Sequence, residues 1–358
     1  MENLGEPDKS HAARLLLLNL RPDEFRAWLA AQGEPPMRAR QLRRWIFAGR
    51  AESFDQMTDL PHGLRQTLSD EFELFGSRVV RHFQANDNTH KLLLGLRDEE
   101  LIECVLLQEV DRHTACISTQ VGCGMGCVFC ASGLGGIVRN LTRGEILEQL
   151  LRLRNLLPPG QRLTHIVVMG MGEPLANLDE LLSALEAAGA KDGLDIGARH
   201  ITISTVGLPS KIRRLADQGK QYHLAVSLHA PNDSVRTRIV PTNEKTGLPA
   251  ILAAADYFFE RTGRQVTFEY VLLRGINDQP EHARELARLL NGRHAHVNLI
   301  PFNDVIGLPY RRPTDEALSA FVAELRQAGI SVKVRKRKGS EIDAACGQLR
   351  RQESGVGS

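Results

Sequence analysis

From about residue 100 onward, short apolar segments rich in β-branched residues alternate with longer amphipathic segments, and this alternation limits the possible folds more than any other feature. Seven segments have strand character: 115–118, 165–169, 200–204, 223–228, 266–272, 296–300 and 330–334. Strands that alternate with helices of about ten to fifteen residues predict right-handed βαβ units and a parallel sheet. We therefore expect an α/β fold with about six βα units in an open or partial barrel, with functional groups at the C-terminal strand ends.

The connecting segments carry start and stop signals for helices. Thr142 and Glu145 form a capping box in front of an apolar run. Thr314 opens a later helix, and Gly329 ends it. No Gly-x-Gly-x-x-Gly motif follows the first strand, so a partial barrel is favoured over a doubly wound sheet.

The N-terminal part of the chain has a different pattern. Helical periodicity covers residues 22–31 and 38–48, and no convincing strand occurs before a short strand pair at 91–96 and 100–107. We expect two domains: a small helical accessory domain in residues 1–95, and the barrel core in residues 96–358.

Cysteine is scarce, and its distribution points to metal chemistry. Of six cysteines, four lie between residues 116 and 130, which is a poor layout for structural disulfides. Cys123, Cys127 and Cys130 form a CxxxCxxC triad, whose thiolates are typical ligands of an iron–sulfur cluster and would leave one iron open. Structural zinc is the alternative, with Cys116 or His113 as a fourth ligand, although no second paired knuckle exists.

Charge and hydropathy narrow the functional classes. The net charge is only +2, but arginines gather in residues 38–50 and basic residues in 333–338. The longest apolar run near the N-terminus, Leu15–Leu18, is far shorter than a membrane helix or signal-peptide core. We expect a cytoplasmic protein that does not bind membranes.

The triad Cys123-x-x-x-Cys127-x-Phe129-Cys130 resembles the signature of the radical S-adenosylmethionine (SAM) superfamily. Five stretches narrow the resemblance to the RlmN/Cfr-type RNA adenine methylases: TACISTQVGCGMGCVFCASG, VMGMGEPLAN, VSLHAPND, VNLIPFN and IDAACGQL. The resemblance implies one 4Fe-4S cluster held by the three cysteines, with SAM chelating the open iron. It also implies that each turnover uses two SAM molecules.

The same resemblance assigns roles to individual residues. The implied SAM pocket comprises Gly172, Glu173, Ser204, Ser227, Leu228, His229 and Asn303. Cys346 matches the methyl-carrying cysteine, and Cys116 matches the cysteine that resolves the covalent adduct through a transient disulfide. Glu103 matches the proton acceptor, and Cys104 has no counterpart.

The implied reaction is methylation of adenosine C2 in 23S ribosomal RNA and in some transfer RNAs, next to the anticodon. The implied partners are these RNAs and a flavodoxin or ferredoxin electron donor, and we expect a monomer. A Cfr-type C8 methylase that confers antibiotic resistance is the alternative, although GEP at 172–174 and QVGC at 120–123 favour the RlmN type. A non-catalytic RNA-binding metal protein is the alternative from a different class.

Overall fold

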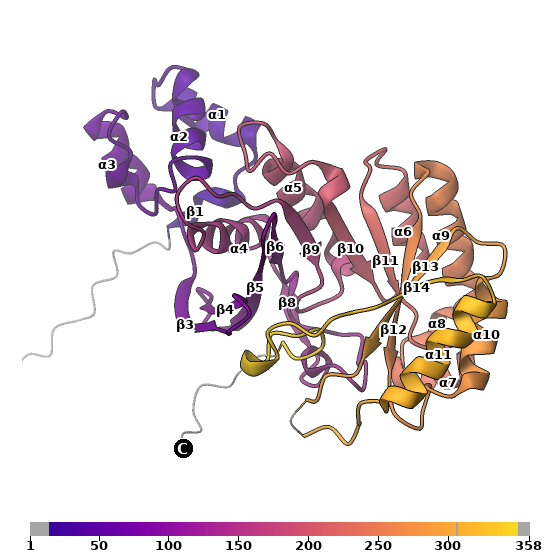
Figure 1. Cartoon of the computed structure of the whole chain (residues 1–358). Helices are drawn as coiled ribbons and strands as arrows, with labels where there is room; N and C mark the ends of the chain where they lie inside the picture. Colours follow the sequence, from indigo (N-terminus) through magenta and orange to yellow (C-terminus); the bar gives the residue numbers. More distant parts are fainter. Residues whose placement is uncertain (1–13, 306, 350–358) are drawn as a thin grey trace, which may run out of the picture.

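Seven parallel strands form the core of the fold in the computed structural model, which describes residues 14–305 and 307–349 (Figure 1). In sheet order they are β14 (Ser331–Val334), β13 (Ala295–Pro301), β12 (Val266–Leu272), β11 (His223–Ser227), β10 (Ile201–Thr205), β9 (His165–Val168) and β6 (Arg112–Cys116). Each neighbouring pair is parallel.

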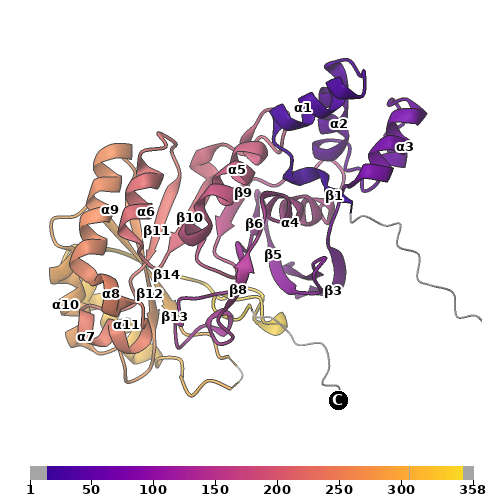
Figure 2. The same cartoon turned by 180° about the vertical axis from the view of Figure 1, so that it is seen from behind.

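Helices connect successive strands and cover the outer face of the sheet (Figure 2). They are α4 (Arg143–Asn155), α5 (Leu178–Gly189), α6 (Pro209–Ala216), α9 (Leu248–Thr262), α10 (Pro280–Leu290) and α11 (Asp315–Gln327), with the short α7 (Asp233–Ile239) and α8 (Asn243–Thr246) before α9. Six βα units therefore precede β14 within the described residues, and the expected partial barrel is confirmed. None of the helices in these ranges has the length and apolarity needed to cross a membrane.

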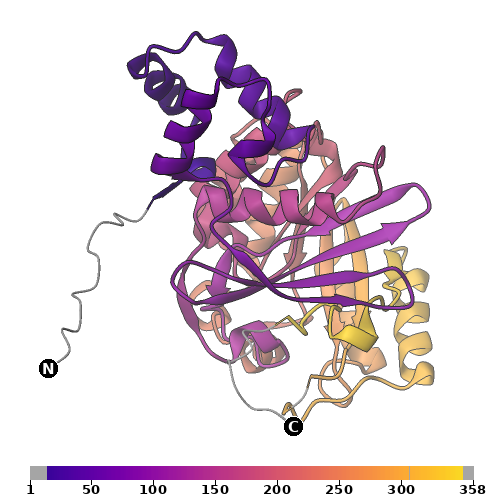
Figure 3. The same cartoon turned by 90° about the vertical axis from the view of Figure 1, so that its left-hand side faces the viewer.

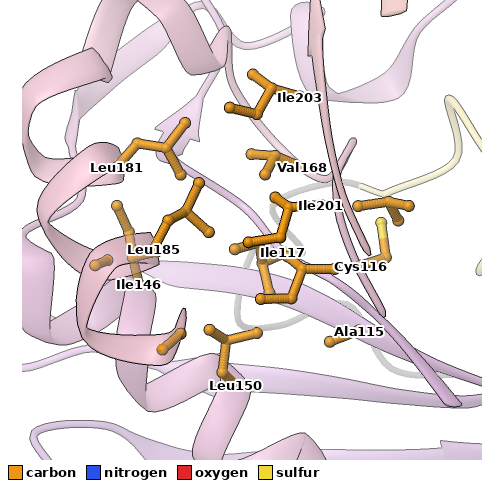
Figure 4. Close-up of a cluster of buried hydrophobic side chains, with 14 of the residues drawn as sticks. Ala115, Cys116, Ile117, Ile146, Leu150, Val168, Leu181, Leu185, Ile201 and Ile203 are labelled. Atoms are coloured by element: carbon orange, nitrogen blue, oxygen red, sulfur yellow. The ribbon is translucent and has the colours of Figure 1, made fainter. Parts of the chain in front are cut away.

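The main core lies between the sheet and its outer helices (Figure 4). Side chains alternate along β6 and the residue that follows it, so Ala115 and Ile117 face Ile146 and Leu150 of α4. All four are fully buried, and burying each large aliphatic side chain contributes about 2 kcal/mol. The Cys116 sulfur points to the opposite, inner face of the sheet.

The expected helix signals are present in the structure. Thr142 Oγ1 accepts a hydrogen bond from the Glu145 backbone N–H, and the Glu145 carboxylate accepts one from the Thr142 N–H at 2.8 Å. Thr314 caps α11 by accepting from Ala317, and Gly329 follows the helix with a φ of +75°. These bonds satisfy backbone groups that a helix end leaves without partners.

Three antiparallel strands extend the sheet beyond β6: β5 (Leu101–Glu109), β4 (His90–Gly95) and β3 (Arg78–Gln84). The expected strand pair corresponds to β4 and β5, whereas β3 was not expected. The proposed domain boundary after residue 95 falls inside the β4–β5 hairpin. Because β3 and β4 belong to the ten-stranded sheet, a boundary between residues 74 and 78 separates the helices from the sheet better.

The N-terminal helices α1 (Pro22–Ala31), α2 (Met37–Phe47) and α3 (His62–Glu71) stand beside one end of the sheet, above the antiparallel strands (Figure 3). A short parallel pair, β1 (Leu15–Leu16) with β2 (Phe72–Glu73), joins the two ends of this unit. Two buried arginines of α4 bind its backbone: Arg143 donates to the carbonyls of Leu18 and Leu20, and Arg154 to those of Ile46 and Phe47.

Most arginines of the basic run at 38–50 bind groups of the protein itself. Arg38, Arg43 and Arg44 pair with Glu34, Asp192 and Asp59, respectively. Arg50 donates to three backbone carbonyls in residues 157–161. The run is therefore largely a set of structural contacts and only in part a free basic surface.

The segment after β14, residues 335–349, crosses from one edge of the parallel sheet to the antiparallel strands (Figure 1). We call it the closing segment. Lys338 Nζ lies 2.6 Å from Glu109 Oε1, and the Gly339 N–H donates to Asp87 at 2.9 Å. Lys91 Nζ donates to the Asp343 carbonyl at 3.3 Å. The closing segment thus covers the open side of the half-barrel.

Candidate active site

A cavity of about 150 Å³ lies at the C-terminal ends of the parallel strands, between the cysteine loop and the closing segment. Ten of the expected site residues line it: Cys123, Cys127, Cys130, Gly172, Glu173, Ser204, Ser227, His229, Asn303 and Cys346. The remaining three, Leu228, Cys116 and Glu103, do not line it. The fold thus brings together residues that are far apart in the sequence.

The cysteine loop is shaped by a small two-stranded sheet, β7 (Gln120–Gly122) with β8 (Ile137–Asn140). Gly122 has a φ of +74°, and a Cβ atom there would lie 2.1 Å from the Gly136 carbonyl oxygen. Only glycine allows this approach, which lets the Cys123 N–H donate to the same oxygen at 2.9 Å. The loop therefore turns sharply at the first cysteine.

The end of the cysteine loop is bound to the closing segment. The Ala131 N–H donates to the Gly347 carbonyl at 2.8 Å, and Ser132 Oγ donates to the Leu349 carbonyl at 2.5 Å. Asn303 Nδ2, at the end of β13, donates to the backbone oxygen of Cys346 at 3.2 Å. Cys346 is thus fixed next to the triad by three separate hydrogen bonds.

The electrostatics of the triad fit a metal cluster. Burial raises the pKa of the Cys123 thiol to about 11 and also raises the pKa values of Cys127 and Cys130. Repulsion between the neighbouring sulfurs adds to this effect at Cys123 and Cys127. Three thiolates in such a place require a bound cation, because the thiolate is the form that binds metal.

A mononuclear zinc site fits less well than a cluster. Tetrahedral zinc needs four ligands at about 2.0 to 2.3 Å from one ion. Among residues 14–305 and 307–349, no group of three or more His, Cys, Asp and Glu side chains, the triad included, is arranged to hold a single metal ion. The three triad cysteines line an open cavity, which suits a larger cluster with one exposed corner.

Glu173 places a carboxylate in the cavity wall, in the turn that follows β9. Its two oxygens accept hydrogen bonds from the N–H groups of Leu175, at 3.0 Å, and Val206, at 2.7 Å. Burial raises its pKa, and these hydrogen bonds oppose that rise. At Gly172 the φ is +101°, and a Cβ atom would lie 2.6 Å from the Gln120 side chain, so the chain makes a turn that only glycine fits.

Ser204 and Ser227 lie on adjacent strands with their hydroxyl oxygens 3.4 Å apart. Burial, with a smaller contribution from Arg236, lowers the pKa of His229 to about 3, so its ring is neutral at pH 7. Its Nδ1 accepts from the Val271 N–H at 3.1 Å, which leaves Nε2 as the N–H donor. The Leu228 side chain is buried in the main core, and its backbone N–H donates to the Glu269 carbonyl at 3.0 Å.

Cys116 and Glu103 lie beside the cavity on the same inner face. Cys116 is directly opposite Val105 in the β5–β6 ladder, and Glu103 is two residues before Val105 on that face. Burial, together with the charge of Cys346, raises the pKa of Cys116 to about 12, and Arg335 opposes the rise. Cys104, between them in sequence, is fully buried in the core on the opposite face.

Sequence reasoning missed Arg335 and Glu269 as cavity residues. Arg335 belongs to the basic run at 333–338, but its side chain turns inward and lines the cavity. Glu269 could have been found from the sequence, because it is a single carboxylate within the apolar strand segment 266–272. A charged group there is expected to have a buried partner.

Comparisons with known proteins assign the chain to a family. The sequence pattern of the Radical SAM superfamily matches residues 117–290, and that of the ribosomal RNA large subunit methyltransferase N-terminal domain matches 16–74. The chain is 55% identical to a probable dual-specificity RNA methyltransferase RlmN of Rhodopirellula baltica, over 98% of this chain and 93% of that protein. This chain belongs to the RlmN family of radical SAM methyltransferases.

Other members of the RlmN family and a solved structure agree. A relative of the same name from Bacillus licheniformis is 45% identical over 92% of both chains. The crystal structure of a radical SAM methyltransferase from Sphaerobacter thermophilus superposes with a TM-score of 0.92 and 44% identity, over 94% of this chain and 99% of that one. The expected resemblance is confirmed, and the relatives' names favour the RlmN type over the Cfr type. As a radical SAM enzyme, the protein uses a 4Fe-4S cluster and SAM.

Proposed function

We propose that the protein methylates C2 of adenosine in 23S ribosomal RNA and in some transfer RNAs, with Cys346 as the carrier of the methyl group. The placement of Cys346 carries this proposal. Its thiol lines the same cavity as Cys123, Cys127 and Cys130, although it comes from the opposite end of the barrel. A radical generator that needs only SAM and its substrate has no use for a fourth, separately anchored thiol.

The three triad cysteines would hold the cluster, and Gly172, Glu173, Ser204, Ser227, His229 and Asn303 would hold SAM. The Glu173 carboxylate suits the SAM ammonium group, while the serine hydroxyls and the His229 N–H suit hydroxyl and carboxylate groups. Leu228 would contribute through its backbone, because its side chain faces the core. When bound, the cluster supplies one electron that cleaves SAM to a 5′-deoxyadenosyl radical.

Cys346 would accept a methyl group from a first SAM molecule by displacement, and a second SAM molecule would serve the radical step. The 5′-deoxyadenosyl radical would take one hydrogen atom from this S-methyl group, and the resulting methylene carbon, still attached to sulfur, would bond to the adenine. The adduct would then lose one electron and the ring proton. The Cys116 thiolate would attack the Cys346 sulfur, so that a disulfide forms and the sulfur–carbon bond breaks. The electron pair of that bond goes to the carbon, which takes up a proton, and the methylated base is released. We propose that a flavodoxin or ferredoxin system supplies the electron to the cluster, and that an external thiol reduces the disulfide again.

Glu103 would accept the proton that leaves the adenine ring. Its carboxylate is ion-paired with Lys91, which also binds the closing segment at Asp343. Because Glu103 lies beside the cavity and not in its wall, this role requires the closing segment to shift when RNA enters. Movement of this segment would also make room for an adenine, which must leave its stack to reach the barrel.

We further propose that the helical unit of residues 14–74 is the accessory domain that contacts RNA, and that the enzyme acts as a monomer in the cytoplasm. Exposed Arg40, Lys336 and Arg337 are available for phosphates. The match of residues 16–74 to an N-terminal domain named for ribosomal RNA methyltransferases supports this assignment. Phosphate contacts of this kind give affinity and register, while the cavity selects the base.

The test is a reaction of the anaerobically reconstituted protein with SAM, a reductant and RNA transcripts, followed by digestion and mass spectrometry of nucleosides. We expect 2-methyladenosine; 8-methyladenosine alone would support the Cfr-type activity. Absence of 5′-deoxyadenosine would support a non-catalytic RNA-binding protein. Cys346→Ala and Cys116→Ala should each abolish the product, whereas Cys104→Ala, a matched buried cysteine outside the cavity, should retain it.

A further inference from the structure

Arg335 lies where the last parallel strand meets the cavity. Its backbone N–H donates to the Leu299 carbonyl at 2.8 Å, which continues the β13–β14 pairing by one residue. Its side chain lines the cavity together with Cys346 and Glu269, while the next two residues, Lys336 and Arg337, are exposed. Of the basic run at 333–338, Arg335 is thus the member that lines the cavity.

The guanidinium of Arg335 is surrounded by sulfur and by one carboxylate. Its Nη1 lies 3.7 Å from the Met169 sulfur, and Cys346 lines the same cavity wall. Cys346 first, and then Glu269 and Cys116, raise the pKa of Arg335 despite its burial. Arg335 therefore remains a cation, and the charges of Cys346 and Cys116, to which the proposed reaction assigns chemistry, both act on it.

Glu269 is a carboxylate in the same cavity wall, and its charge acts on this cation. It is buried on β12, and Asn298 Nδ2 on the neighbouring strand donates to its Oε2 at 2.9 Å. Burial raises the pKa of Glu269, while Arg335 and Asn298 lower it. The carboxylate is thus held in one position, from which it can anchor the guanidinium.

No other cation lines the cavity among the described residues, because the only other basic side chain there, His229, is neutral. A thiol must lose its proton before it can attack a methyl group or another sulfur. An unpaired anion in a buried place is costly, so each thiolate needs a positive partner. Apart from a bound cluster, Arg335 is the group in the cavity wall that can supply this charge.

We propose that Arg335 is a positioning residue that pairs with Cys346 Sγ as a thiolate for methyl transfer, and then with Cys116 when that thiol attacks Cys346. This inference rests on the proposed roles of the two cysteines. In the first step the thiol proton leaves to solvent, the Cys346 Sγ–CH3 bond forms, and the bond between the SAM sulfur and its methyl group breaks, giving S-adenosylhomocysteine. The methylated sulfur is neutral and no longer attracts the guanidinium. The guanidinium can then pair with the Cys116 thiolate.

The test measures the reactivity of Cys346 itself, in cluster-loaded protein without SAM or RNA. The rate of Cys346 alkylation by iodoacetamide is followed by peptide mass spectrometry across a range of pH. We expect Arg335→Met to lower the rate at neutral pH by about tenfold or more and to move the profile to higher pH, since one pKa unit changes the thiolate fraction about tenfold. Arg335→Lys should restore part of the rate.

A matched control and an opposite change complete the design. Arg326→Met removes an exposed arginine at the end of α11 and should leave the profile unchanged. Glu269→Gln removes the carboxylate that competes for Arg335 and should move the profile to lower pH. The other titratable groups near Cys346, namely Cys116 on β6 and Cys130 in the cysteine loop, are the same in all variants.

Wild-type alkylation rates in Arg335→Met would overturn the proposal. If that variant fails to fold or to keep its iron, Arg335→Lys and Glu269→Gln decide, and unchanged profiles in both would overturn it. The result is independent of the RNA reaction. Suppose that the wild-type protein makes no methyladenosine but Arg335→Met still lowers the rate of Cys346 alkylation. This result would contradict the proposed function and support the role of Arg335.

Discussion

Lys91 and Glu103 form a buried ion pair between neighbouring strands β4 and β5, with Lys91 Nζ 2.8 Å from Glu103 Oε1. The two side chains are 3% and 0% exposed, and the Lys91 ammonium also lies 5.1 Å from the Phe83 ring centroid. Lys91 reaches the closing segment as well, through the Asp343 carbonyl. One side chain thus couples the antiparallel strands to the segment that carries Cys346.

Replacement of Lys91 by methionine should strongly destabilise the fold. It removes the positive partner of a buried carboxylate, and breaking a buried ion pair in this way costs about 3 kcal/mol or more. We expect the free energy of unfolding in urea to fall by that amount. Lys220→Met, which removes an exposed lysine, should change it by less than about 0.5 kcal/mol. Equal stability of the two variants would contradict the importance of the pair.

Gly122→Ala should prevent the cysteine loop from closing. The added Cβ would lie 2.1 Å from a backbone oxygen, which cannot move without breaking its hydrogen bond to Cys123. We expect the reconstituted variant to bind little iron. Gly126→Ala is the control, since Gly126 also has a positive φ, +65°, but nothing lies within 4 Å of its Cβ position. It should cost only about 1 kcal/mol and keep most of the iron. Similar iron content in both variants would contradict the claim that the cysteine loop needs glycine at position 122.

His165 should titrate well below the ordinary histidine range. Burial, with the positive Arg112 and neighbouring His200, lowers its pKa from 6.5 to about 4, and its Nε2 lies 3.2 Å from His200 Nδ1. Because the folded-state pKa lies below the unfolded value, the unfolded chain binds more protons between the two. The stability that His165 contributes is therefore complete above about pH 6.5 and is lost as the pH falls toward 4.

Proton NMR of the His165 ring in folded protein, recorded as a function of pH, measures the midpoint of its titration. Arg112→Gln removes a like charge and should raise it, though only in part, since burial is the larger cause. A midpoint near 6.5 in the wild type would show that the ring is more solvated than the structure indicates.

Arg154→Met should loosen the N-terminal helical unit from α4. The Arg154 guanidinium binds the carbonyls of Ile46 and Phe47 at the C-terminal end of α2, and it is almost fully buried. Carbonyls at a helix end need outside donors, so their loss should cost about 2 kcal/mol. We expect faster hydrogen exchange across α1–α3 with little change in the barrel. Arg162→Met, which removes an exposed side chain, should leave exchange unchanged.

Much of the fold could be predicted because buried apolar side chains recur at regular intervals along its strands and helices. The apolar run at 266–272 coincides with β12, and the helical pattern at 22–31 coincides with α1. Strand β3 could not be found in this way. It is an edge strand whose residues are nearly all exposed, so it lacks the alternation of apolar and polar side chains that marks a half-buried strand.

The parts of the candidate site that could be predicted are those whose chemistry requires a fixed spacing of residues in the sequence. Three cysteines within eight residues are recognisable in any context, and the polar residues at strand ends follow from the barrel topology. The inward turn of Arg335 was not predictable. It depends on the register of β14 against β13, and its neighbours in the sequence have the same charge.

The closing segment also has a consequence for the order in which the protein is made. Strands β4 to β14 are complete before residues 335–349 emerge, and chains synthesised on ribosomes tend to fold from the N-terminal side first. At that stage the partly synthesised chain has its cysteine loop but lacks the part of the cavity wall that Arg335, Cys346 and Gly347 provide. The reaction chamber can therefore be completed only after all strands of the barrel have been synthesised.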